Sequence, residues 1–179
     1  MKTQIMNLIK SILNNWFWLV LILFIVWSQG PTYWKLWQIQ GKTASLSGPM
    51  TNLNDSQIIN SLPENKALVL IFWASWCGPC KIELNRHAQA VQNGELPADQ
   101  IIALNLGEDI NTLQQFIKEH PYPFKILIDS QQVLAQKFDV QVTPTLIHID
   151  QNNKIVWASA GISPTSIWRA KRLLAAITN

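Results

Sequence analysis

Charged side chains are scarce in this sequence of 179 residues, making up only 14% of it, while hydrophobic residues make up 48%. A chain with so little charge is neither intrinsically disordered nor a polyelectrolyte. Internal repeats and low-complexity tracts are also missing from the sequence, which excludes a fibrous protein. The length suits one compact domain with about 40 residues to spare and is too short for two.

Clusters of basic residues that would bind nucleic acid are missing as well. The formal net charge is +3, but Lys2 and Lys10 supply two of these charges. Residues 31–179 carry 12 basic and 11 acidic side chains, a difference of +1, with no basic stripe interleaved with aromatic residues. Because nucleic-acid-binding proteins present such a basic surface, nucleic acid is not an expected partner.

The N-terminal segment has no acidic residue before Asp55, and no polar residue interrupts it from Trp16 to Trp27. A helix of about 17 residues here spans about 25 Å, slightly less than a hydrocarbon core of about 30 Å, and flanking side chains can bridge the difference. The two early lysines place the N-terminus in the cytoplasm under the positive-inside rule. The sequence therefore predicts a cytoplasmic segment at 1–10, a transmembrane anchor at 11–30 and an exported remainder.

A cleaved signal peptide is the alternative interpretation, because an apolar run of twelve residues also fits its hydrophobic region. The residues that follow, 27–31 (WSQGP), contain no A-x-A pattern, and Pro31 blocks the one small-residue cleavage site. An uncleaved anchor is therefore favoured. A buried helix of a soluble protein is disfavoured, because a segment that is apolar on every face needs a larger core than this chain provides.

The rest of the chain reads as a linker followed by one α/β domain. Residues 31–50 mix turn formers with scattered polar residues and lack a sustained period, which predicts a linker with a short strand near its end. Over residues 51–179, apolar runs of strand length alternate with helical patterns. Strands are predicted at Ala67–Trp73, Ile101–Leu106, Phe124–Ile128, Thr145–Ile149 and Lys154–Ala158. Helices are predicted at Cys80–Gln92, Ile110–Glu119 and Gln131–Phe138.

A last helix is predicted to begin with Ser163 as its N-cap and Pro164 at its first position. Four apolar residues then share one face of this helix: Ile167, Ala170, Leu174 and Ile177. Turn formers at 150–153 mark a hairpin before it. Strands and helices alternate first and a hairpin plus helix closes the chain, an order that predicts an α/β sandwich with a mixed central sheet.

The only two cysteines lie together in the motif Trp76-Cys77-Gly78-Pro79-Cys80, between a predicted buried strand and a predicted helix. Unpaired N–H groups and the positive end of the dipole at a helix N-terminus favour a thiolate at Cys77. Cys80 follows one turn later on the same face, near enough to close a disulfide. Pro79 is tolerated in a first helical turn.

Two other uses of the cysteines are disfavoured. A structural disulfide that closes four residues constrains the unfolded chain least, so a stabilising bridge would join distant residues. A metal site needs further ligands, and the chain has only three histidines: His87, His120 and His148. His87 lies two turns beyond Cys80, about 10 Å along a helix, too far to share one ion with the cysteines.

The pattern predicts thiol-disulfide exchange, in which the Cys77 thiolate attacks a partner disulfide and Cys80 resolves the mixed disulfide. Cys80 is deeper in the helix and needs help to lose its proton. Glu83, three residues further on the same side, is the nearest candidate base in the sequence. The alternative is that Glu83 is an exposed helix carboxylate.

The segment FWASWCGPC after a buried strand, with Val142-Thr143-Pro144-Thr145 about 65 residues later, resembles the thioredoxin superfamily across about residues 50–178. The resemblance implies a thioredoxin-like fold whose only redox group is the Cys77–Cys80 disulfide, without a cofactor or metal. It also implies a cis peptide bond before Pro144, with this loop facing the cysteines in a substrate groove. The expected substrate-binding residues are Trp76, Gly78, Pro79, Thr143 and Pro144.

Within the superfamily, the anchor, the Cys-x-x-Cys-x-x-Glu pattern and an insertion at 107–122 resemble the TlpA-like branch of membrane-tethered periplasmic thioredoxins. The C-terminal stretch is most similar to the suppressor-for-copper-sensitivity D-type oxidoreductases. Two departures are Ile71, where cytoplasmic thioredoxin has a buried aspartate, and Asn85, where many TlpA-like proteins have proline. The first departure makes Glu83 more necessary as a base.

The resemblance implies a monomeric protein disulfide oxidoreductase anchored in a bacterial inner membrane, with its catalytic domain in the periplasm. Its partners would be protein thiols or disulfides, the lipid bilayer and a membrane electron donor. The Gly-Pro dipeptide between the cysteines is similar to that of reducing thioredoxins, so a reductant is expected. The alternatives are a copper-handling or docking module and a dedicated cytochrome c maturation thioredoxin.

Overall fold

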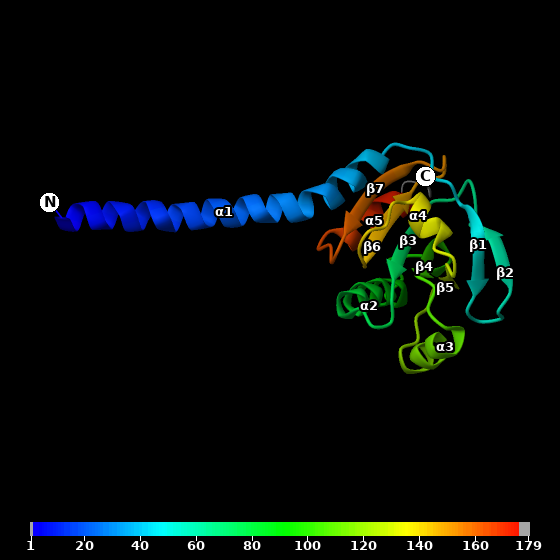
Figure 1. Ribbon diagram of the computed structural model, residues 1–179. Coiled ribbons are helices and arrows are strands. Elements are labelled where there is room, and N and C mark those ends of the chain that lie inside the picture. Colours follow the sequence, from blue (N-terminus) through cyan, green and yellow to red (C-terminus); the bar gives the residue numbers. More distant parts are fainter. Residues whose placement is uncertain (1, 176–179) are drawn as a thin grey trace. The chain divides into compact units, whose positions relative to one another are not determined.

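The computed structural model describes the backbone of residues 2–175 and the side chains of residues 16–28 and 30–175. The chain divides into two compact units, and the boundary along the sequence lies between Lys35 and Leu36. Most of the long helix α1 (Lys2–Ile39) belongs to the first unit, and all strands and the other helices belong to the second (Figure 1).

Helix α1 is longer than the predicted anchor and contains Pro31. A proline inside a helix lacks an N–H donor and crowds the carbonyl four residues earlier, here that of Trp27, so a bend is expected at this point. No single helix among the described residues is long and apolar enough to cross a membrane alone. The two segments Trp16–Ser28 and Gly30–Ile39, bent by 42° at the break between them, meet the length and composition requirement together.

The second unit is built on a seven-stranded sheet with the order β2-β1-β5-β4-β3-β6-β7 (Figure 1). Strands β3, β4 and β5 are parallel, and all other neighbours are antiparallel, so the sheet is mixed as predicted. The strands are β1 (Ser47–Asn52), β2 (Ile58–Ser61), β3 (Leu68–Trp73), β4 (Ile101–Asn105), β5 (Lys125–Ile128), β6 (Thr145–Ile149) and β7 (Ile155–Ala160). The helices are α2 (Gly78–Gln92), α3 (Ile110–Glu119), α4 (Val133–Lys137) and α5 (Ser166–Ala175), with a short 3-10 turn η1 (Ala98–Gln100).

The central strand β3 is buried at every position. Its side chains alternate between two apolar cores, one under α2, α3 and α5 and one under α4 and the end of α1. Ile71 and Trp73 belong to the first core, and Leu70 and Phe72 belong to the second. Because both faces of the sheet are covered, the strand is a continuous apolar run, as the sequence predicts.

The short strand predicted near the end of residues 31–50 is present as β1, but these residues are not a separate linker. Helix α1 continues to Ile39, and Leu36, Leu46 and Met50 are buried in the core of the second unit. Their apolar side chains reach the core from a helix end, a loop and an edge strand, so they show no sustained period. Strand β2 was not predicted, because it is short and three of its four residues are exposed.

The predicted N-cap of the last helix is also wrong. Helix α5 begins at Ser166, three residues after Ser163, and residues 164–165 form a turn. The Ser163 carbonyl accepts the Ser166 N–H at 3.2 Å, which makes Ser163 part of that turn. Ala170 and Leu174 are buried on the predicted face, Ile167 is half-buried, and Ile177 lies outside the described residues.

Candidate active site

The cysteine pair lies where β3 ends and α2 begins. Cys77 is the N-cap of α2 and has an extended backbone, and its Sγ accepts the Cys80 N–H at 3.2 Å. This bond satisfies one of the N–H groups that a helix leaves unpaired at its start. Pro79 lies in the first turn, where a missing N–H removes no helical hydrogen bond.

Cys77 and Cys80 form a disulfide, with their Cα atoms 5.2 Å apart. The two residues differ in exposure, since Cys77 is 5% exposed and Cys80 is fully buried. Cys77 is therefore the more accessible of the two cysteines. When the bond is reduced, the α2 N-terminus favours a thiolate at Cys77.

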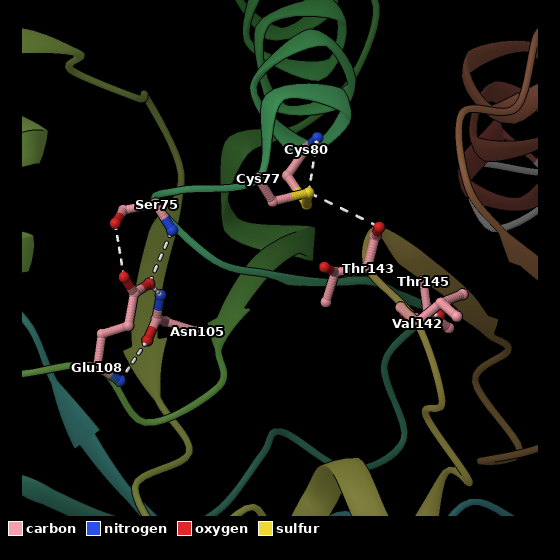
Figure 2. The surroundings of a disulfide bond; sticks show 8 residues. All are labelled: Ser75, Cys77, Cys80, Asn105, Glu108, Val142, Thr143 and Thr145. Atoms are coloured by element: carbon pink, nitrogen blue, oxygen red, sulfur yellow. Dashed lines mark hydrogen bonds between the residues drawn. A yellow bond between two sulfur atoms is a disulfide. The ribbon is translucent and has the colours of Figure 1, made fainter.

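The loop before β6 faces the disulfide, as predicted (Figure 2). The peptide bond between Thr143 and Pro144 is cis, and the Thr143 carbonyl oxygen lies 3.7 Å from Cys77 Sγ. The Thr145 hydroxyl donates to the Val142 carbonyl at 2.7 Å, which closes this loop on itself. Pro144 is buried and Thr143 is half-buried.

An exposed surface surrounds the buried sulfurs. Trp76 is 76% exposed directly before Cys77, and Gly78 and Pro79 are exposed after it. Val142, on the facing loop, is 43% exposed. Apolar side chains are thus exposed on both sides of Cys77.

Glu83 is completely buried, which makes the exposed-carboxylate interpretation wrong. Its carboxylate accepts a hydrogen bond from the Ser166 hydroxyl on α5 and one from Arg86 at 3.0 Å. Arg86 also donates to the carbonyls of Ser163 and Pro164, at 2.7 and 3.1 Å. These contacts join α2 to the turn and helix at the C-terminal end of the domain.

Two buried histidines lie in this same layer. His87 Nδ1 is 2.9 Å from the Glu83 carbonyl oxygen, and the His148 ring meets Trp157 edge-on at 4.6 Å between centroids. Burial lowers the pKa of His148 to about 3, with His87 and Arg169 acting in the same direction, and burial also lowers the pKa of His87. The approach of His87 Nδ1 to the Glu83 carboxylate, at 3.8 Å, is therefore not an ion pair near neutral pH.

Glu108 is a site residue that the sequence did not reveal. Its carboxylate accepts the Ser75 backbone N–H at 2.7 Å, the Ser75 hydroxyl at 2.5 Å and the Asn105 side-chain amide at 2.5 Å (Figure 2). Ser75 lies two residues before Cys77. No local sequence signal marks Glu108, because Ser75 and Glu108 meet only through the parallel pairing of β3 and β4, whose carboxyl ends bring the segments after Trp73 and Asn105 to one edge of the sheet.

Fold and site together define a protein with the thioredoxin-like fold and a Cys-x-x-Cys disulfide at its centre. A disulfide at a helix N-terminus faces a cis-proline loop, on a mixed sheet covered by helices on both faces. The chain belongs to the Redoxin family, whose model matches residues 42–177.

Relatives of the chain carry the name thiol-disulfide oxidoreductase ResA. The protein of that name from Bacillus subtilis is 27% identical over 118 residues, which cover 66% of each chain. The one from Geobacillus thermodenitrificans is 30% identical over 90 residues, covering 50% of this chain and 52% of the relative. The matched region thus spans between about half and two thirds of the length of these relatives.

Solved structures share the fold. StoA from Bacillus subtilis has a TM-score of 0.58 at 22% identity, covering 70% of this chain and 94% of StoA. A secreted disulfide oxidoreductase of Mycobacterium tuberculosis has a TM-score of 0.55 at 20% identity, covering 73% of this chain and 96% of that protein.

Proposed function

We propose that this protein exchanges disulfides with protein substrates through Cys77 and Cys80. The Cys77 thiolate attacks a substrate disulfide, so that one substrate sulfur leaves as a thiolate and the other stays bound to Cys77. The Cys80 thiolate then attacks Cys77, which releases the second substrate thiol and forms the Cys77–Cys80 disulfide. Two electrons pass to the substrate, and the reverse sequence oxidises it.

The observation that carries this proposal is the disulfide itself, with its more exposed sulfur at the start of α2 and 3.7 Å from the Thr143 carbonyl oxygen. A helix start stabilises the thiolate that must form and leave in each step. The disulfide is the only redox group that the proposal needs. The proposed substrate-binding residues are Trp76, Gly78, Pro79, Thr143 and Pro144, of which Pro144 is buried next to Thr143 and the others line the surface.

Glu83 is proposed as the base for Cys80. It follows Cys80 by three residues on α2 and is as deeply buried as Cys80. The hydrogen bonds from Ser166 and Arg86 hold its carboxylate in place. Replacing Glu83 by glutamine should slow the release of mixed disulfides more than their formation, because only the second step needs the Cys80 proton removed.

The proposed location is the bacterial inner membrane, with residues 11–30 of α1 as a single-pass anchor, the N-terminus in the cytoplasm and the catalytic domain, a monomer, in the periplasm. The apolar side chains of residues 16–27 are mostly exposed and form no core of their own, which supports contact with lipid. A tethered domain suits electron delivery from a membrane donor, so the proposed direction is reduction of the substrate. A reduction potential well above those of reducing thioredoxins would contradict this direction.

Insulin reduction by the full chain in detergent, driven by a chemical dithiol, tests the proposed activity. The parent protein should turn over, whereas Cys77→Ser should be inactive and Cys80→Ser should stall as a mixed disulfide. Equal rates for the parent and Cys77→Ser would contradict the proposal. That result would favour a docking or metal-handling module instead.

A further inference from the structure

Glu108 connects the segment after β4 with the segment that leads from β3 to the cysteines. One carboxylate oxygen accepts the Ser75 N–H and the Asn105 amide, and the other accepts the Ser75 hydroxyl. Asn105 is fully buried, and its side-chain oxygen accepts the Glu108 N–H at 2.9 Å. Both polar ends of the Asn105 side chain are therefore used to hold Glu108.

The turn before Glu108 fixes where this residue can lie. Gly107 has φ of +85°, and a Cβ atom there would lie 2.9 Å from the Ser130 carbonyl oxygen. Only glycine adopts this backbone at such close approach without strain. On the other side, Asp109 caps α3 by accepting the Thr112 N–H at 3.0 Å. Glu108 is thus held between a close backbone contact and the start of a helix.

The segment from Trp73 to Cys77 is held by hydrogen bonds that involve four of its five residues. The Trp73 carbonyl accepts the Leu106 N–H at 3.2 Å, and the Ala74 carbonyl accepts the Cys77 N–H at 3.2 Å. Ser75 donates both its N–H and its hydroxyl to Glu108. Without Glu108, the described hydrogen bonds leave Ser75 unattached in the middle of this segment.

We propose that Glu108 is a positioning residue for the redox pair, acting through Ser75. By fixing the loop that ends at Cys77, it keeps the Cys77 sulfur at the first N–H groups of α2 and opposite the Thr143 carbonyl (Figure 2). This inference rests on the proposed function for its biological meaning, and the geometry that it describes is measurable without a substrate. It predicts that hydrogen-bond acceptance, and not negative charge, is what the reaction needs from Glu108.

Glutamine at position 108 separates the hydrogen bonds of Glu108 from its negative charge. Its carbonyl oxygen can accept from the Ser75 N–H and Asn105, and its amide can donate to the Ser75 hydroxyl, which then serves as acceptor. Glu108→Gln therefore keeps all three contacts and loses the charge. Glu108→Ala loses both. Glu119→Ala removes an exposed glutamate from the end of α3 and is the matched control.

The test is the alkylation rate of Cys77 by iodoacetamide in the reduced full chain between pH 5 and 9, read by peptide mass spectrometry. Glu108→Ala should slow alkylation at pH 7 by about 10- to 100-fold, as expected when a reacting group is displaced. Glu108→Gln and Glu119→Ala should be alkylated at the parental rate within experimental error, since neither removes the contacts to Ser75. Insulin reduction should follow the same order.

Two results would overturn the inference: equal slowing in Glu108→Gln and Glu108→Ala, or a parental rate in Glu108→Ala. Should Glu108→Ala fail to fold, Ser75→Ala gives a second test in the parent and Glu108→Gln backgrounds. Loss of the hydroxyl should slow alkylation by about threefold in both backgrounds, and no slowing in either would overturn the inference. If the parent does not reduce insulin but the alkylation order holds, the proposed function fails and the positioning role stands.

Discussion

At the residue scale, two glycines that both have a positive φ angle differ in what surrounds them. Gly107 has φ of +85° and no room for a Cβ atom, whereas Gly94 has φ of +71° and nothing within 4 Å of that position. Gly107→Ala should lower the free energy of unfolding by about 2 to 4 kcal/mol, through backbone strain and the contact with Ser130. Gly94→Ala should cost about 1 kcal/mol, from strain alone. Urea denaturation of both variants measures the difference, and equal losses would contradict the close contact.

The buried histidines make stability depend on pH. The pKa of His148 is lowered to about 3 by burial, by His87 on α2 and by Arg169 on α5, whereas the unfolded chain titrates near 6.5. The unfolded state therefore binds more protons below pH 6.5, so stability is full above that pH and falls as the pH drops toward 3. Between pH 6.5 and 5 the loss from His148 is about 2 kcal/mol, and His87, whose pKa is also lowered, adds to it.

Urea denaturation at pH 7.5, 6.0 and 5.0 measures this loss. The His148→Leu variant should show a smaller decrease in stability over this range than the parent. Leucine is a fair replacement because His148 Nε2 has no hydrogen-bond partner among the described residues. A variant whose stability falls as steeply as that of the parent would show that His148 does not cause the effect.

At the scale of elements, Glu83 and Arg86 on α2 hold α5 and the turn before it. Removing one partner of a buried pair leaves a charge without compensation, so Glu83→Ala should lower the free energy of unfolding by about 3 kcal/mol. The matched control is Glu95→Ala, which breaks the exposed ion pair between Glu95, just after α2, and Lys171 on α5, and should cost less than about 1 kcal/mol. Denaturant unfolding measures the loss of stability in both variants. Similar losses would contradict the claim that the buried contacts of Glu83 stabilise the packing of α2 against α5.

The elements that could be predicted are those whose neighbours leave a simple pattern. Helix α3 has the predicted bounds, because Asp109 caps its start and Pro121 follows its end. Strand β3 is buried on both faces and therefore reads as an unbroken apolar run. Strand β1 contains Gly48 and Pro49 and lies next to the edge strand, so its sequence shows no alternation.

The site could be predicted where function depends on residues close in the sequence. Cys77, Cys80 and the cis bond before Pro144 are carried by two short motifs. Glu108 could not be found in this way, because its partner Ser75 lies 33 residues away and meets it only through the pairing of β3 with β4. Contacts between parallel strands leave no local pattern in the sequence.

At the scale of the whole molecule, the apolar part of α1 should hold the protein in a membrane. Leu23 is 66% exposed in the middle of the apolar run, so Leu23→Arg places a charge where insertion costs about 2.5 to 3.5 kcal/mol. The parent should stay in the membrane pellet after alkaline carbonate extraction, and the variant should be partly released. Lys125→Arg, which keeps a charge far along the chain, is the control. Release of the parent itself would contradict the anchor.

The proposed reaction requires that Cys77 attacks a partner disulfide and that Cys80 resolves the product. The most direct measurement uses the reduced full-length Cys80→Ser protein, mixed with oxidised insulin and analysed by mass spectrometry without reductant. We expect a covalent adduct through Cys77 that a dithiol releases, and no adduct with Cys77→Ser under the same conditions. No adduct with Cys80→Ser, or an equal one through Cys80 in Cys77→Ser, would contradict the proposed reaction.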